Sequence, residues 1–205
     1  FMNYSLILLI LVNLQSCHER DAKWFRIESK GLDYHITFTL SKAGDDADIY
    51  SFFKLIKGTP LIDKEEMISE LINYKGDERT SDFIINYNKN LSQFYMGKRR
   101  KTTVEIQALF LINQLYFDNP YYYSPYQILI DQEGNEIFGS REKINEVFNC
   151  YANWFSKIKK MGMGKIKALN IRPLDNSPYR WMYGLNVSPL QPLQFDISKI
   201  VLPED

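Results

Sequence analysis

The chain has 205 residues and carries 25 basic and 25 acidic side chains, so its formal net charge at pH 7 is zero. Nucleic-acid binding needs a concentrated excess of Lys and Arg, and this neutral balance therefore argues against a nucleic acid as the partner. Two cysteines are too few for a disulfide framework, so burial of apolar side chains has to stabilise the fold.

An apolar run, YSLILLILVNL, extends from Tyr4 to Leu14. It has the length of the central region of a signal peptide and is too short to cross a bilayer as a helix. A buried helix of the core is the alternative interpretation of such a run. We favour the targeting segment, and the sequence then predicts a signal peptide at residues 1–16.

The run ends in LQSC, with Leu14 three residues before Cys17 and a small residue directly before it. This motif resembles the lipobox of bacterial lipoprotein precursors. In that family the cysteine thiol is acylated and the chain is cut before it, which implies a lipid on Cys17 and a place in the bacterial cell envelope, on its periplasmic or surface face. Residues 17–23 would then be the lipidated cysteine and its tether, and residues 24–205 a single globular domain.

The first elements of that domain follow from apolar spacing and capping residues. Trp24–Glu28 and Asp33–Leu40 alternate around Gly31, which is typical of a β-hairpin. Three helices are expected next: from Asp45 or Asp46 to Gly58, from about Asp63 to Gly76, and from about Ser81 to Met96.

A fourth helix has the strongest signal. Thr102 and Glu105 have the spacing of a capping box, and Ala108–Ile112 is apolar on every side. We expect this helix to lie at the centre of the core.

The second half of the chain adds a hairpin, a long helix and an irregular tail. Gln127–Asp131 and Asn135–Phe138 flank a turn, and Arg141–Lys160 has one continuous apolar stripe. Beyond Gly164 the prolines predict an extended segment that wraps over the core. The sequence thus predicts an α+β fold: one helix-dominated compact domain with one or two β-hairpins and an extended Pro-rich C-terminal segment.

Catalytic chemistry has little support in the sequence. The two histidines, His18 and His35, form no zinc motif, and no base is indicated beside Cys150. Two groups of neighbouring acids could supply the paired carboxylates of a hydrolase: Asp45, Asp46 and Asp48, or Asp131 and Glu133. Roles in helix caps and turns explain these acids equally well. We therefore predict no catalytic residue, no metal site and no cofactor.

Two basic clusters have a structural and a functional interpretation. They are Lys98–Lys101, and Lys157, Lys159, Lys160, Lys165 and Lys167. A solvated loop and a favourable helix C-terminus explain most of these residues. In a tethered protein they could also meet an acidic partner or anionic lipid headgroups.

Aromatic and arginine residues in the proline-containing segments are the candidate partner-binding residues, because Tyr, Trp and Arg most often dominate interfaces. They are Tyr121, Tyr122, Tyr123, Tyr126, Arg172, Tyr179, Arg180, Trp181 and Tyr183. Burial in the core is expected for about half of these rings.

A small, neutral lipoprotein of this kind resembles in general type the immunity lipoproteins that neutralise toxins delivered into the envelope. That resemblance implies a non-catalytic protein whose partner is another protein. A glycan-binding surface lipoprotein is the alternative, and it requires Tyr121–Tyr126 and Trp181 to line one open cleft. A carboxylate hydrolase requires two acids that face each other in a pocket.

Overall fold

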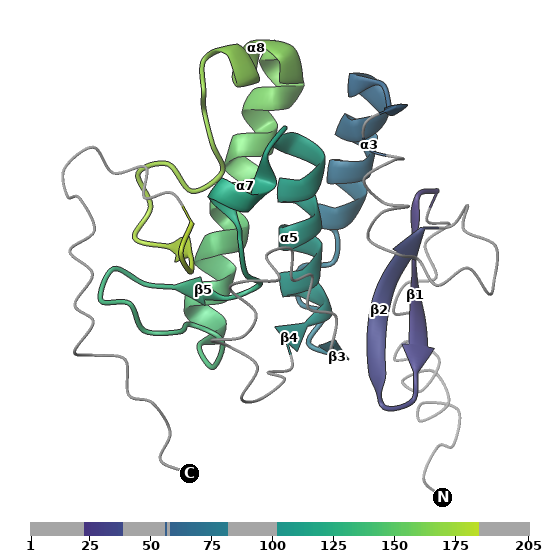
Figure 1. Cartoon of the computed structure of the whole chain (residues 1–205), viewed down its shortest axis with the longest axis vertical. Coiled ribbons are helices and arrows are strands. Elements are labelled where there is room, and N and C mark those ends of the chain that lie inside the picture. Colours follow the sequence, from purple (N-terminus) through teal and green to yellow (C-terminus); the bar gives the residue numbers. More distant parts are fainter. Residues whose placement is uncertain (1–22, 39–55, 57, 82–101, 185–205) are drawn as a thin grey trace, which may run out of the picture.

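The computed structural model describes residues 23–38, 56, 58–81 and 102–184. Helices dominate it and short antiparallel strand pairs accompany them, which confirms the expected α+β class. Three helices stand side by side: α3 (Leu61–Ile72), α5 (Val104–Tyr116) and α7 (Arg141–Met161). The first strand pair lies beyond α3, and β5 (Leu129–Ile130) lies at the opposite side of the molecule (Figure 1).

The predicted N-terminal hairpin is confirmed. β1 (Phe25–Lys30) pairs antiparallel with β2 (Asp33–Phe38), and Gly31 takes the positive φ of 69° that the turn requires. Phe25 and Ile36 face the core. The backbone N–H groups of Trp24 and Phe25 donate to the Glu70 carboxylate of α3, so this end of the hairpin is fastened to a helix.

The helix expected from Asp63 to Gly76 is also present. It begins two residues earlier, at Leu61 directly after Pro60, and Gly76 follows its end at a φ of 88°.

The expected helices near residues 45–58 and 81–96 lie almost entirely outside the described residues. Ser81 itself belongs to β3 (Thr80–Ser81), which pairs with β4 (Thr102–Thr103), so a helical start at Ser81 is wrong.

Helix α5 is the centre of the core, as expected, and all 13 of its residues are buried. The predicted capping box is wrong. Thr103 caps the helix by accepting a hydrogen bond from the Ile106 N–H at 3.4 Å, whereas Thr102 lies in β4. The Glu105 carboxylate turns instead to Arg141 at 2.5 Å and to the Gly76 N–H at 2.9 Å, because tertiary partners satisfy it better than its own helix end.

Helix α7 confirms the predicted stripe. The buried residues of this helix are Ile144, Val147, Phe148, Tyr151, Trp154, Phe155 and Ile158. Ser140 caps its first turn, and Gly162 ends it at a φ of 81°.

The predicted second hairpin is present as a turn, but the main strand partner of β5 is a different segment. Residues 129–137 do turn back, with a single bridge between Ile130 and Glu136, but the ladder of β5 is formed with β6 (Arg180–Trp181). The segment beyond Gly164 is also less extended than expected, because α8 (Met163–Ala168) begins it. A partner strand about 50 residues away along the chain leaves no local periodicity by which it could be recognised.

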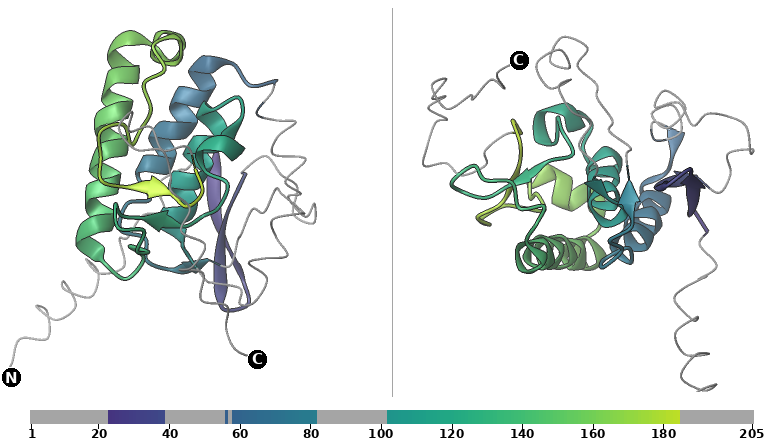
Figure 2. Two further views of the ribbon diagram at one scale, coloured as in Figure 1. Left: turned by 60° about the vertical axis from the view of Figure 1, so that its left-hand side comes forward. Right: turned by 90° about the horizontal axis from the view of Figure 1, so that it is seen from below.

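Residues 171–184 are part of the core. Tyr116 Oη and Trp154 Nε1 both donate to the Ile171 carbonyl, at 2.9 and 3.2 Å. The Leu174 N–H donates to Tyr123 Oη at 3.1 Å. Figure 2 shows that β6 lies across the helices. Buried aromatic hydroxyl and indole groups require partners, and this segment supplies them.

Within the described residues, no helix is both long enough and apolar enough to span a membrane. The predicted signal peptide and Cys17 lie outside these residues.

Candidate functional site

The structure divides the candidate partner-binding residues into two groups. Four rings are buried in the core: Tyr123, Tyr126, Tyr179 and Trp181. Tyr122 is 63% exposed and Tyr183 is 45% exposed, while Arg172 and Arg180 are half-buried. Tyr121 belongs to the short helix α6 (Pro120–Tyr123), and the position of its side chain is outside the described part.

The buried group forms a hydrogen-bonded network that holds β6 to the helices. Trp181 Nε1 donates to Tyr151 Oη at 2.9 Å, and that hydroxyl donates to Asn113 Oδ1 at 2.7 Å. Burial raises the pKa of Tyr151, so the hydroxyl keeps its proton and remains a donor. Trp181 therefore positions the chain around it and cannot itself reach a partner.

The exposed tyrosines, Tyr122 and Tyr183, lie on two segments that are in close backbone contact. A Cβ atom at Gly184 would lie 2.1 Å from the Tyr123 carbonyl oxygen, so only glycine permits this close contact between residues 120–123 and 180–184. Tyr183 has a φ of 56°, and its ring meets the Tyr126 ring edge-on with centroids 5.7 Å apart. The two exposed tyrosines thus come from two segments that are locked together.

Two arginines accompany these segments: Arg180 lies within residues 180–184, and Arg172 lies two residues before Leu174, whose N–H donates to Tyr123 Oη. Arg172 Nε donates to Asn170 Oδ1 at 3.2 Å, and Arg180 lies on β6 opposite Ile130. Neither arginine forms an ion pair with an acid in the part of the chain that the structure describes. We call Tyr122 and Tyr183, together with Arg172 and Arg180, the tyrosine surface.

Residues 49–182 match the model of a family described as a domain of unknown function, DUF4943. The chain belongs to this family. The DUF4943 match begins beyond the β1–β2 hairpin and includes every described helix together with β6, so it contains the whole network around Trp181. No curated protein and no solved structure matches the chain.

Cys150, Asp131 and Glu133 are the groups of the described DUF4943 domain that were considered for catalysis. Cys150 is half-buried, and burial together with the Glu146 carboxylate raises the pKa of its thiol, which disfavours the nucleophilic thiolate. Asp131 pairs with Lys143 at 2.8 Å, and this bond lowers the pKa of the carboxyl group, the opposite of what a general acid needs. Glu133 is exposed in the adjoining turn.

Asp45, Asp46 and Asp48, the other acids considered for a hydrolase, lie outside the described residues. Within the residues that are described, no group of three or more His, Cys, Asp or Glu side chains could hold a metal ion.

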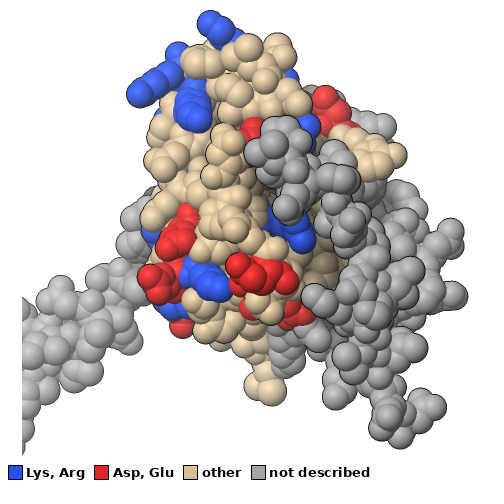
Figure 3. All heavy atoms as spheres, turned by 90° about the vertical axis from the view of Figure 1, so that its left-hand side faces the viewer, with Lys and Arg blue, Asp and Glu red and all other residues tan. Residues whose placement is uncertain are grey.

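A second feature occupies the end of the molecule where α3 begins and α7 ends. Lys157, Lys159, Lys160 and Lys165 are exposed there. Lys167 is bound to Asp118 at 2.7 Å. Figure 3 shows the basic residues gathered at this end, above a mostly uncharged middle and a mixed acidic and basic region. The other basic cluster, Lys98–Lys101, lies outside the described residues.

Sequence reasoning missed the apolar side chains at the same end. Leu61, Ile62, Met161 and Leu169 are all exposed. The pair Leu61–Ile62 directly after Pro60 was the available signal, because the first turn of a surface helix more often carries polar residues.

Proposed function

We propose that this chain is a lipid-anchored, non-catalytic protein of the bacterial cell envelope that binds a protein partner through the tyrosine surface. The observation that carries the proposal is the pair of exposed rings, Tyr122 and Tyr183, on two segments locked together at Gly184. The lipid anchor rests on the resemblance of LQSC at Cys17 to a lipobox.

A rigid aromatic surface suits a protein partner. Tyrosine offers a large contact area and loses little conformational freedom on binding, and a preformed backbone lowers the cost of ordering the interface. Arg172 and Arg180 add donors without acidic partners in the described chain, which favours a partner with carboxylates near its contact surface. A toxin delivered into the envelope would be such a partner for an immunity-type lipoprotein.

The glycan alternative has less support. It requires Tyr121–Tyr126 and Trp181 to line one open cleft, but Trp181 is 1% exposed, and Tyr123 and Tyr126 are 5% exposed. Tyr122 and Tyr183 alone offer a small platform for stacked sugar rings.

A pull-down from native membranes tests the proposal. The bait is the full lipidated chain, compared with a Tyr122→Ala/Tyr183→Ala variant. Leu32→Ala is the matched control, because Leu32 is 89% exposed at the tip of the β1–β2 hairpin, on the other side of the molecule. We expect wild type and control to capture the same stoichiometric protein, and the double variant to lose about tenfold or more of its affinity.

Intact-mass measurement of the bait tests the anchor separately. A diacyl or triacyl mass on Cys17 supports it, and an unmodified N-terminus contradicts it. Equal capture by all three baits would contradict the tyrosine surface. A lipidated bait that captures no protein but binds an oligosaccharide would favour the glycan alternative.

A further inference from the structure

From the end of the molecule where α3 begins, we infer a second interaction surface that docks on an anionic lipid bilayer. We call it the basic apolar end and define it as Leu61, Ile62, Met161 and Leu169 together with Lys157, Lys160 and Lys165. Its occupant is the headgroup layer of a membrane, and it is separate from the tyrosine surface.

The four apolar residues converge on one end of the fold. Leu61 Cδ1 lies 3.9 Å from the position of a Cβ at Gly164, and the Met163 N–H donates to Glu65 Oε1 at 2.9 Å. These contacts place the start of α3 against the junction of α7 and α8. Half of the eight large apolar side chains that are exposed in the described residues belong to this end, so exposed apolar side chains are concentrated there within that part of the chain.

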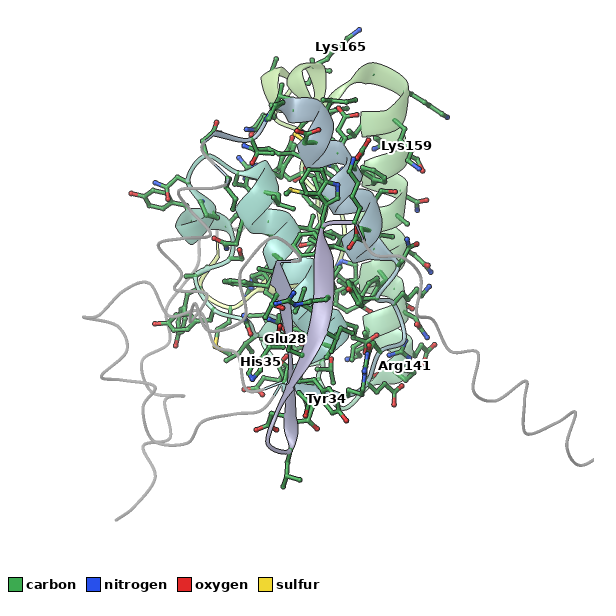
Figure 4. All side chains as sticks on the ribbon, turned by 90° about the vertical axis from the view of Figure 1, so that its right-hand side faces the viewer. Glu28, Tyr34, His35, Arg141, Lys159 and Lys165 are labelled. Atoms are coloured by element: carbon green, nitrogen blue, oxygen red, sulfur yellow. The ribbon has the colours of Figure 1, made fainter. Side chains whose placement is uncertain are left out.

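The lysines lie on the same helix ends as Met161 and Leu169. Lys157 and Lys160 lie on the last turns of α7, and Lys165 lies on α8. Figure 4 shows Lys159 and Lys165 at the end of the molecule opposite Arg141, with Lys165 directed away from the body. None of these four lysines forms an ion pair within the described chain.

Within the described residues, no acid forms an ion pair with Lys157, Lys160 or Lys165. Glu65 accepts a hydrogen bond from the Met163 N–H, Asp118 pairs with Lys167, and Asp63 is half-buried in the first turn of α3. A helix C-terminus favours lysines without any ligand, but it gives no reason for exposed Leu, Ile and Met beside them. Exposed aliphatic side chains beside lysines are typical of surfaces that lie in the membrane interface.

The residue types at the basic apolar end favour a membrane over a protein as its partner. Protein hot spots are enriched in Tyr, Trp and Arg, and those residues gather on the tyrosine surface instead. Lysine with aliphatic residues matches a diffuse anionic surface, where no bidentate geometry is required.

A lipid anchor at Cys17 would allow the basic apolar end to face the membrane. Lys23, the first described residue, contacts Glu66 at 2.6 Å, little more than one helical turn from Leu61. Five residues separate Cys17 from Lys23, and the chain from Cys17 to Lys23 reaches at most roughly 20 Å. A lipid on Cys17 would therefore keep the basic apolar end within reach of the bilayer. This step rests on the proposed anchor, whereas the surface itself does not.

Vesicle binding tests the inference with a Cys17→Ser full chain, so that failure of the anchor and failure of the docking surface are distinguishable. Lys160→Gln/Lys165→Gln is compared with Arg26→Gln/Lys75→Gln, which removes the same charge elsewhere. Because the apolar N-terminal run is identical in every variant, differences between variants report the charge changes alone. We expect the ratio of binding to anionic over neutral vesicles to fall about 25-fold in the first variant and to stay unchanged in the second. The vesicles are phosphatidylcholine with or without phosphatidylglycerol.

An environment-sensitive dye gives the orientation. The dye is placed at Ile62→Cys or, as the control, at Leu32→Cys, with Cys17 and Cys150 replaced by Ser. Anionic vesicles should shift the emission to the blue at position 62 and leave it unchanged at position 32. Equal binding by both charge variants, or no shift at position 62, would overturn the inference. A concentration-dependent dimer broken by Ile62→Ser would also overturn it, by identifying a second copy of the chain as the occupant.

Discussion

The indole of Trp181 donates to the hydroxyl of Tyr151 at 2.9 Å, deep in the core and across 30 residues of chain. The bond joins the short strand β6 to the middle of α7. Because the same hydroxyl donates to Asn113 of α5, one tyrosine links three elements. The position of the tyrosine surface depends on this link, since Tyr183 follows Trp181 by two residues.

Trp181→Phe should lower the free energy of unfolding by about 2–3 kcal/mol, because it leaves a cavity and removes a donor from a buried hydroxyl. Urea denaturation measures the change. Tyr151→Phe should cost a similar amount, and the double variant should cost less than the sum of the two, because the residues share one hydrogen bond. Strict additivity would show that the bond contributes nothing.

Gly184→Ala should destabilise the domain by about 1–3 kcal/mol, because the new methyl group would lie 2.1 Å from the rigid Tyr123 carbonyl. Gly139→Ala is the matched control, since a Cβ there meets nothing within 4 Å. Its thermal midpoint should stay near wild type. Partner capture should weaken with Gly184→Ala even where the domain remains folded, because Tyr122 and Tyr183 lose their common base.

Arg141→Met should cost about 3 kcal/mol, because it leaves the Glu105 carboxylate, 1% exposed, without its cation. The cost stays near the lower end of the range for a buried ion pair, because the Arg141 side chain is 37% exposed and its charge is partly solvated in the wild type. Adding Glu105→Gln should restore most of the stability, because it removes the unpaired charge and keeps an acceptor for the Gly76 N–H. Denaturant midpoints of the single and double variants decide the matter, and a double variant as unstable as Arg141→Met would contradict this account.

Acid should weaken the bond between Asp131 and Lys143. The bond lowers the pKa of Asp131 in the folded chain, so its contribution is fully present above the ordinary carboxyl pKa of about 3.9 and is lost as the pH falls below that value. Wild type should therefore lose more stability than Asp131→Asn between about pH 5 and pH 2.5. The asparagine keeps an acceptor for the Asn135 N–H. Parallel stability curves for the two proteins would contradict the prediction.

Several elements could be predicted because their signals are local. The stripe of α7 and the all-round apolar α5 follow from the 3.6-residue period, and the β1–β2 hairpin follows from alternation around Gly31. The half-burial of Cys150 agrees with its place on the flank of the α7 stripe. The candidate site was predicted only as a set of residues, without the division into buried and exposed rings.

The sequence by itself determined the helix-dominated α+β class, the central helix and the absence of a net charge, since each depends on composition or on neighbouring residues. Only the tertiary structure decided that Glu105 leaves its helix end for Arg141, that β5 pairs with β6, and that Trp181 is buried while Tyr183 is exposed. It also brought Leu61 next to Gly164 of α8. Such outcomes depend on which distant segments pack together, and periods of two or 3.6 residues carry no information about that choice.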